Sequence, residues 1–130
     1  MIPEFEKSGN LPKGVYKATL QELKEIFGAS TARRKWLIGN LEEIIGLAQS
    51  TGNLERVIIW GSFVSNKKLP QDIDLLIIMG ELFVIDRVLP KVRKIFNYVE
   101  GRLAFNADIF WTKSSIGEKT INLWLETYQM

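Results

Sequence analysis

The sequence has no cysteine and no histidine among its 130 residues. Without cysteine the chain has no disulfide framework and no thiolate nucleophile, and without either residue type it lacks the usual ligands of zinc. The absence of histidine also excludes a Ser-His-Asp triad. Any catalysis by this chain must therefore use carboxylates, hydroxyl groups, lysines and a hard metal ion.

Long apolar runs and a strong charge of one sign are missing as well. No apolar run approaches the length of a membrane span, and the first residues lack the basic-then-apolar pattern of a signal peptide. The 17 Lys and Arg residues against 15 Asp and Glu residues give a formal charge of +2, too small to indicate nucleic-acid binding by charge alone. We therefore expect a cytoplasmic protein with no membrane partner.

The sequence does contain enough apolar material for one core, because hydrophobic residues make up 46% of it. It shows no internal repeat and no obvious linker, so residues 1–130 are predicted to form a single domain. Residues 1–18 contain Pro3, Gly9, Pro12 and Gly14 and are predicted to form an extended N-terminal arm.

Apolar periodicity predicts helices before and after the strands. The capping-box spacing of Thr19–Glu22 and the apolar residues that follow predict a first helix that ends at Gly28. A second, longer helix is expected to begin near Ser30 or Thr31 and to end at residues 51–53.

Two later segments also have helical periodicity. Residues 81–99 have one apolar helical face, in which Pro90 is expected to kink the helix or restart it. Ser115–Glu118 has capping-box spacing and is expected to open a last helix. The apolar face predicted for that helix consists of Ile121, Trp124, Leu125 and Tyr128.

Three apolar segments, at 56–60, 72–79 and 103–111, predict β-strands. The connection between the first two is too short for a parallel crossover, so we expect them to pair in an antiparallel or mixed sheet. The third follows a helix and is expected to lie parallel to the second. The predicted fold class is α/β (α+β), with a small mixed sheet of at least three strands flanked by helices.

Asp72 and Asp74 are two residues apart in a predicted strand, so both side chains leave the same face of the sheet. Two ionised carboxylates among apolar neighbours repel each other and are costly to desolvate. Mg²⁺ would remove both costs, since it favours carboxylate oxygens together with substrate phosphates. The simpler interpretation is that the two aspartates are solvated at the end of a strand.

Gly61-Ser62 directly follows the first predicted strand. Backbone N–H groups can converge on an anion at such a turn, and the serine hydroxyl adds a donor. By itself the pair is more typical of an ordinary turn. Its position before the aspartate pair makes it a candidate phosphate-binding segment.

These two features together resemble a known motif. Trp60-Gly61-Ser62, nine further residues and Asp72-Ile73-Asp74-Leu75 resemble the hG[GS]…Dh[DE]h motif of the DNA polymerase β-like nucleotidyltransferase superfamily, and in particular its minimal nucleotidyltransferases. The similarity includes the arm segment 10–14 and says little about the last 20 residues. It implies the nucleotidyltransferase fold, with a third carboxylate on the strand that follows the motif.

Asp108 matches that third carboxylate by its position in the third predicted strand. Its neighbours Ala107 and Ile109 are expected to point to the opposite face, and a parallel neighbouring strand lies about 4.8 Å away, so three carboxylates can meet. The competing acids, Glu81 and Asp86, fall on or before a predicted helix.

The resemblance implies roles for five residues. Asp72, Asp74 and Asp108 would be catalytic and would bind Mg²⁺ or Mn²⁺, and Asp108 would also accept the proton of the attacking hydroxyl. Gly61 and Ser62 would bind the phosphates of a nucleoside triphosphate, with ATP the expected one. Apart from the resemblance, Lys67 or Lys68 would neutralise phosphate charge, although loop lysines are more often simply solvated. The chain would transfer NMP from this NTP to a hydroxyl group on a protein, an RNA or a small molecule.

The resemblance also implies partners, and it leaves alternatives open. Minimal nucleotidyltransferases often belong to bacterial toxin–antitoxin or phage-defence pairs, which implies a cognate toxin or antitoxin, and a homodimer is considered as well. One alternative is a non-catalytic or weakly catalytic antitoxin or interaction protein on the same fold. A second is another metal-dependent phosphate enzyme, such as a phosphohydrolase, although many such sites add histidine ligands.

Two further expectations concern exposed side chains. The basic run 33–35 at the start of the second helix is expected to face solvent, where it opposes the helix dipole and offers a contact for acceptor or phosphate. Phe63 and Tyr98 are considered as exposed aromatic residues for stacking on a base, against packing in the core or at an edge.

Overall fold

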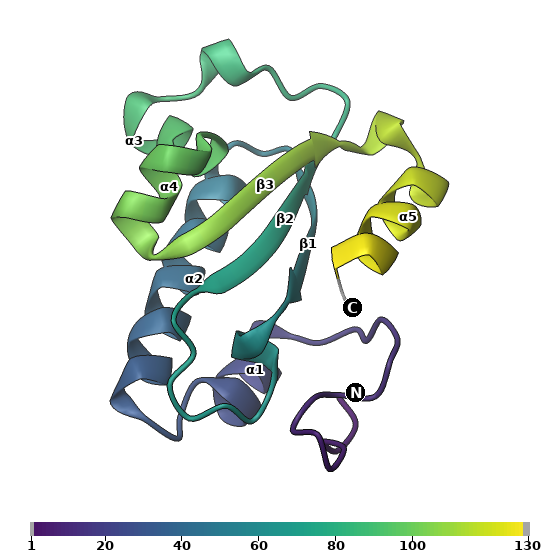
Figure 1. Cartoon of the computed structure of the whole chain (residues 1–130). Helices are drawn as coiled ribbons and strands as arrows, with labels where there is room; N and C mark the ends of the chain where they lie inside the picture. The colour runs from purple at the N-terminus through teal and green to yellow at the C-terminus, as the bar shows by residue number, and fades with distance from the viewer. Residues whose placement is uncertain (1, 129–130) are drawn as a thin grey trace.

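A three-stranded sheet forms the centre of the protein (Figure 1). The structure, a computed structural model, describes residues 2–128, with side-chain surroundings up to Leu123. The strands are β1 (Leu54–Trp60), β2 (Ile73–Met79) and β3 (Ala107–Lys113), in that spatial order. β1 runs antiparallel to β2, and β3 runs parallel to it, which confirms the predicted mixed sheet.

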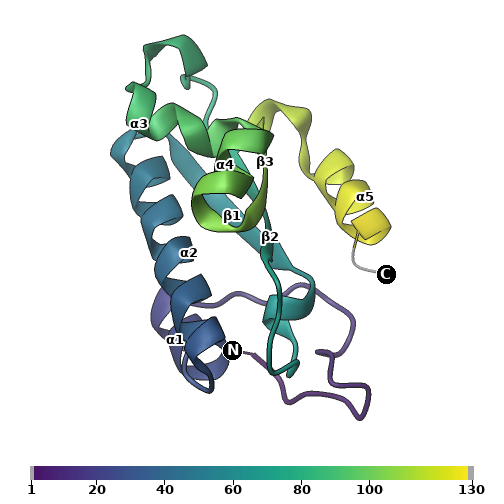
Figure 2. The same cartoon turned by 60° about the vertical axis from the view of Figure 1, so that its left-hand side comes forward.

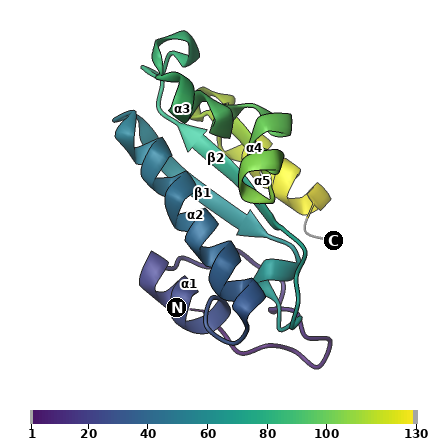
Figure 3. The ribbon, with the colours of Figure 1, turned by 90° about the vertical axis from the view of Figure 1, so that its left-hand side faces the viewer.

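Helices cover both faces of this sheet (Figures 1 and 2). The long helix α2 (Ala32–Ser50) and the short helices α3 (Pro90–Arg93) and α4 (Tyr98–Phe105) lie against one face, and α5 (Glu118–Tyr128) lies against the other. Helix α1 (Leu20–Phe27) packs beside the start of α2, as Figure 3 shows. Within residues 2–128, no helix combines the length and the hydrophobicity that crossing a bilayer would need.

The first two helices begin and end where local sequence signals predict. Thr19 caps α1 in a complete capping box with Glu22, and Gly28 follows the last helical residue. Thr31 caps α2 through a hydrogen bond that its side chain accepts from the backbone N–H of Arg34. These signals act over three or four residues, so they do not depend on tertiary contacts.

Each face of the sheet has its own apolar cluster. The larger cluster lies between the sheet and α2, and it includes Leu37, Leu41, Ile44, Ala48, Ile73, Leu75, Ile77, Ala107 and Ile109. The smaller cluster lies on the opposite face, where Ile121 of α5 packs with Ile58, Trp60, Leu76, Ile78 and Phe110. Side chains therefore alternate between two buried faces along β2, as expected for a central strand.

The predicted helix over 81–99 is wrong. The chain there forms two 3₁₀ turns, η2 (Ile85–Arg87) and η3 (Lys94–Phe96), with α3 between them. Pro90 is the first residue of α3, so it restarts the helix, which is one of the two expected outcomes. Apolar periodicity alone did not detect these breaks.

The predicted start of the third strand, at 103, is also wrong. Asn97 caps α4 by accepting a hydrogen bond from the N–H of Glu100 at 3.0 Å, and the helix continues to Phe105. Asn106 then adopts a left-handed conformation, with φ at +51°, and ends the helix. β3 consequently begins at Ala107.

The capping box predicted at Ser115 is wrong as well. Residues Ser114–Ile116 form the 3₁₀ turn η4, and α5 begins at Glu118. Of the predicted apolar face of this helix, Ile121 is buried in the smaller cluster. Trp124, Leu125 and Tyr128 lie outside the described side chains.

The N-terminal arm is attached to the segment between β1 and β2. Residues 2–18 contain no helix, and Asn10 makes a single antiparallel bridge with Ser65. Next to this bridge, the N–H of Asn66 donates to the carbonyl oxygen of Gly9 at 2.9 Å. The arm thus contacts the residues that follow Gly61-Ser62, the candidate phosphate-binding segment.

Arg34 is buried, which contradicts the expectation that the basic run 33–35 faces solvent. Only 2% of its surface is exposed. Its guanidinium donates to the carbonyl oxygens of Phe27, Phe63, Ser65 and Lys67 at distances between 2.6 and 3.0 Å. Burial lowers the pKa of Arg34, yet an arginine side chain keeps its proton. One charged group therefore fixes the end of α1 and the segment after β1.

Replacing this arginine is expected to destabilise the protein. Arg34→Ala leaves several buried carbonyl groups without a donor, and we expect the free energy of unfolding to fall by about 2–4 kcal/mol. Lys35→Ala, which removes the same charge from an exposed neighbour, should change it by less than about 0.5 kcal/mol. Urea denaturation of both variants measures the difference; equal losses would contradict a structural role for Arg34.

Candidate functional site

Asp72, Asp74 and Asp108 come together at the end of the sheet where β2 and β3 begin. The parallel register pairs Asp74 with Asp108, and Asp72 directly precedes β2. One carboxylate oxygen from each residue lies within 4.8 Å of the other two. Ala107 and Ile109 are buried in the larger cluster on the opposite face, as expected.

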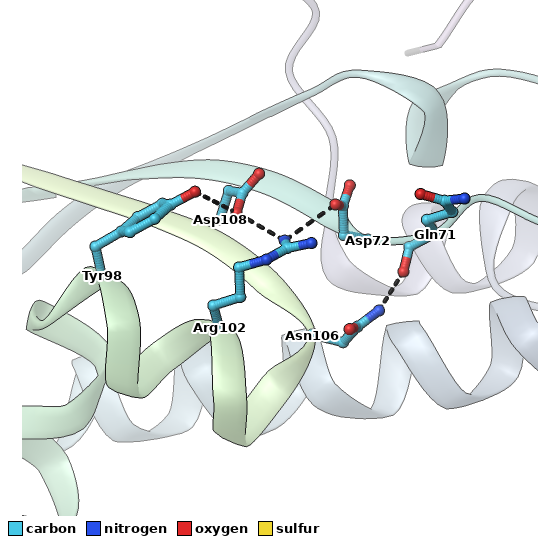
Figure 4. Close-up of polar contacts among 6 residues, drawn as sticks. All are labelled: Gln71, Asp72, Tyr98, Arg102, Asn106 and Asp108. Carbon is cyan, nitrogen blue, oxygen red and sulfur yellow. Dashed lines mark hydrogen bonds and ion pairs between the residues drawn. The ribbon is translucent and has the colours of Figure 1, made fainter.

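Asn106 brings the starts of the two strands together. Its left-handed conformation turns the chain from α4 directly into β3. Its side-chain amide donates to the carbonyl oxygen of Gln71, just before Asp72 (Figure 4). Because Asp108 follows Asn106 by two residues, this link also fixes the positions of Asp72 and Asp108 relative to each other.

Gly61 lies beside Asp74. Trp60, the last residue of β1, pairs with Asp74 across the antiparallel ladder. A Cβ atom on Gly61 would overlap Oδ2 of Asp74, and the φ of +84° at Gly61 is a conformation that other residues rarely adopt. Glycine is therefore required here for its shape and for the space it leaves to the carboxylate.

Ser62 begins the 3₁₀ turn η1 (Ser62–Val64) that follows Gly61. In this turn the N–H of Val64 donates to Gly61 and that of Ser65 donates to Ser62, both at 3.2 Å. The amides of Ser62 and Phe63 precede these bonds, which makes them the candidates for binding an anion. The structure thus places the Gly61-Ser62 turn next to the aspartates.

Lys67, the other predicted phosphate ligand, lies further along the same segment. Its carbonyl oxygen accepts from Arg34 and its N–H donates to Oγ of Ser65 at 3.2 Å. Its side chain is exposed. The backbone of Lys67 therefore stabilises the segment, while phosphate binding by its ammonium group stays a prediction.

A groove of about 1230 Å³ lies between the N-terminal arm, β1 and the segment after β1. Gly61 and Ser62 line it, and so do four basic residues, Lys13, Lys17, Arg56 and Lys67. Glu6 lines the groove as well, and Arg56 pairs with Glu118 at 3.2 Å, so the remaining excess of positive charge comes from the lysines and favours an anionic ligand. The groove therefore extends from the phosphate-binding candidate along the edge strand of the sheet.

A smaller cavity of about 410 Å³ lies on the side of β3. Its lining is mainly apolar and includes Tyr98, Phe110 and Trp111. Of the two aromatic residues considered for stacking on a base, Phe63 is fully buried, which is the core packing that was the preferred alternative for it. Tyr98 is 46% exposed and lines this cavity.

Arg102 and Tyr98 contact the aspartates, and sequence analysis missed both contacts (Figure 4). Nη1 of Arg102 lies 3.0 Å from Oδ2 of Asp72 and 2.8 Å from Oδ1 of Asp108. The hydroxyl of Tyr98 donates to the same Asp108 oxygen at 2.8 Å. Half-exposed ion pairs of this kind contribute only about 0–1 kcal/mol each.

A sequence signal for these contacts exists. Tyr98 and Arg102 are four residues apart, so on a helix they share one face. The signal can be used only if a helix includes Arg102 and ends before Asp108. The predicted helix ended at residue 99 and the predicted strand began at residue 103, so Tyr98 and Arg102 were not placed on one helix. The competing acids lie elsewhere: Glu81 contacts Ser114, and Asp86 lies in η2.

Burial and the negative charges around it shift the pKa of Asp74. Burial raises the pKa of Asp74 to about 7, and a hydrogen bond with Asp108 and the charges of Asp72 and Asp108 act in the same direction, while Arg102 opposes them. Tyr98 has a raised pKa, chiefly because its hydroxyl donates to Asp108. One arginine therefore does not compensate three carboxylates fully, and a further cation would stabilise the group.

Comparison with known proteins gives a family without an assigned activity. The family model described as "Family of unknown function (DUF6932)" matches residues 3–130. No curated protein and no solved structure matches the chain.

The raised pKa of Asp74 predicts a pH-dependent stability in the absence of metal. The ordinary pKa of this carboxyl is 3.8, so between about pH 4 and pH 7 the folded chain binds more protons than the unfolded chain. The contribution of Asp74 to the free energy of unfolding should therefore fall as the pH rises through this window. Asp74→Asn lacks this contribution, and in chelator its melting temperature should rise relative to wild type across the window. If the melting temperatures of the two proteins change with pH in parallel, the raised pKa of Asp74 is contradicted.

Proposed function

The chain belongs to the DUF6932 family, and we propose that it is a metal-dependent nucleotidyltransferase with the nucleotidyltransferase fold. The observation that carries the proposal is the convergence of Asp72, Asp74 and Asp108, with carboxylate oxygens within 4.8 Å of one another, next to Gly61. The glycine turn and the acids come from different strands and meet only in the fold. Their spacing in the sequence resembles that of the superfamily motif.

The donor set fits a hard divalent cation. It consists of three half-buried carboxylates, and hard cations such as Mg²⁺ and Mn²⁺ prefer oxygen ligands. The raised pKa of Asp74 supports the fit, because the ionised form of this carboxylate needs more positive charge than Arg102 provides. When bound, one or two such cations would supply Lewis-acid stabilisation of phosphoryl oxygens and a lowered pKa for the attacking hydroxyl.

The basic groove fits a nucleoside triphosphate, for which ATP is the expected species. The backbone amide and the hydroxyl of Ser62, which lines the groove, would donate to phosphate oxygens beside Gly61. Lys67 lines the same groove and would add positive charge. Gly61 allows this close approach because it has no side chain that would stand between the phosphates and Asp74.

In the proposed reaction, the oxygen of an acceptor hydroxyl attacks the α-phosphorus and a new P–O bond forms. The bond from that phosphorus to the bridging oxygen breaks, and pyrophosphate leaves with the electron pair. The proton of the hydroxyl passes to a carboxylate, and Asp108 is our candidate for it. The acceptor would be a hydroxyl group of a protein, an RNA or a small molecule.

One observation favours a second function, binding of a partner protein such as a cognate toxin or antitoxin. Val99 and Leu103 lie one turn apart on α4 and are 63% and 83% exposed. Apolar side chains that share an exposed helical face are common in protein interfaces. A chain that associated with a partner through these residues and transferred no nucleotide would fit this second function.

Nucleotide transfer provides the direct test. The protein is incubated with each α-³²P-labelled NTP, with Mg²⁺ or Mn²⁺ and with cell lysate, and labelled protein or RNA is detected. We expect label in wild type and a loss of about 100-fold or more in Asp74→Asn, because a metal ligand is removed. Transfer that persists in this variant would discard the proposal. With γ-labelled NTP, release of orthophosphate without transfer would support the phosphohydrolase alternative.

A glycine pair gives a second test. Gly61→Ala should reduce transfer by at least about tenfold, because its Cβ would displace the Asp74 carboxylate and the residue has a positive φ. Gly46→Ala introduces the same methyl group into α2, where nothing lies within 4 Å of it, and should leave transfer unchanged. Similar activities of the two variants would show that Gly61 is not part of the active site.

A further inference from the structure

Arg102 occupies the position next to the aspartates where a cation is expected. Its Nη1 atom contacts Asp72 and Asp108 together, at 3.0 and 2.8 Å, and so links the two strands (Figure 4). We propose that Arg102 is a resident counter-ion that a divalent cation displaces, and that the released guanidinium then contacts the phosphates of the nucleotide. This inference rests on the proposed function and concerns the same site.

Arg102 and a bound cation exclude each other. The oxygens that Arg102 contacts, Oδ2 of Asp72 and Oδ1 of Asp108, belong to the carboxylates that would ligate the metal. A dication at these oxygens would lie within a few ångströms of the guanidinium and repel it. Arginine keeps its proton at accessible pH, so the conflict cannot be relieved by loss of its charge. Only movement of the side chain relieves it.

The side chain of Arg102 can move without disturbing the core. Its side chain is 42% exposed and lies on α4 near the helix end. The backbone there is fixed independently, by the hydrogen bond from Asn40 to Phe105 at 2.9 Å and by the link from Asn106 to Gln71. The long arginine side chain can therefore swing while Asp108 stays in place.

Tyr98 contacts Asp108 from the other side. Its hydroxyl donates to Oδ1 of Asp108 at 2.8 Å, and its ring is tilted against that of Phe110, with 5.5 Å between the centroids. This contact is neutral and is not repelled by a cation. Tyr98 is therefore a positioning residue, which keeps Asp108 oriented while Arg102 leaves.

The destination of the guanidinium follows from its chemistry. A planar guanidinium binds phosphate through two parallel hydrogen bonds, and the phosphates of a metal-bound nucleotide would lie beside the vacated oxygens. The metal would thus displace the guanidinium from the aspartates, and the phosphates of the nucleotide would then bind it. Before nucleotide arrives, Arg102 would keep the affinity for metal low.

The experiment measures metal binding with Mn²⁺ alone, by titration calorimetry of the full chain. Arg102→Gln removes the competing charge, so we expect it to bind Mn²⁺ about five- to tenfold more tightly than wild type. Lys91→Gln removes one positive charge from an exposed position on α3 and serves as the matched control, with an expected change below about twofold. Arg102→Lys retains the charge and should lie between wild type and Arg102→Gln.

A second titration uses α,β-methylene-ATP at saturating Mg²⁺. The same Arg102→Gln variant should bind this nucleotide about tenfold more weakly, because it lacks the phosphate contact. One substitution is therefore expected to change the two affinities in opposite directions, which a general loss of structure would not do.

The outcomes separate this inference from the proposed function. If Arg102→Gln binds Mn²⁺ no more tightly than wild type, or binds the nucleotide equally well, the counter-ion exchange is wrong, while transfer that depends on Asp74 would still support the nucleotidyltransferase. If neither wild type nor Arg102→Gln binds Mn²⁺ and no transfer occurs, both proposals are overturned.

Discussion

The buried guanidinium of Arg34 determines the shape of the segment between β1 and β2, and the candidate site depends on that segment. Its N–H groups bind carbonyl oxygens of Phe63, Ser65 and Lys67, so these carbonyls point inward. A further bond to Phe27 connects the segment to the end of α1. Because the carbonyls are used on the inside, the turn after Gly61 keeps its place beside Asp74 without relying on a ligand.

The protein compensates its buried and crowded charges in two different ways. None of the ion pairs among the described residues includes Arg34, whose charge is balanced by carbonyl dipoles and by the Phe63 ring, with 5.5 Å between the guanidinium carbon and the ring centroid. The three aspartates are the opposite case, since a single half-exposed arginine bridges only Asp72 and Asp108. The first arrangement is complete as it stands and is structural. The second leaves a negative excess, which adds to the effect of burial in raising the pKa of Asp74 and favours an added cation.

The parts of the fold that sequence predicted are those with short-range causes. The capping box at Thr19 and the face shared by Asp72 and Asp74 follow from spacings of two or three residues, and both were predicted correctly. The convergence of Asp108 was predicted from the resemblance and from strand geometry. Errors arose where a short-range pattern competes with a tertiary contact. Arg34 looked like a surface residue because nothing near it in sequence shows that distant carbonyls surround it. Arg102 was missed because its role depends on where α4 ends, and Asn106 determines that end.

The parallel pairing of Asp74 with Asp108 has a consequence for folding itself. If β3 paired with β2 one residue out of register, every side chain of β3 would point to the opposite face of the sheet. Asp108 would then replace Ala107 or Ile109 in the apolar cluster beneath α2, where an ionised carboxylate is strongly disfavoured. Asp108, which we propose as a metal ligand, therefore also destabilises a mispaired sheet during folding. This effect requires no bound ligand.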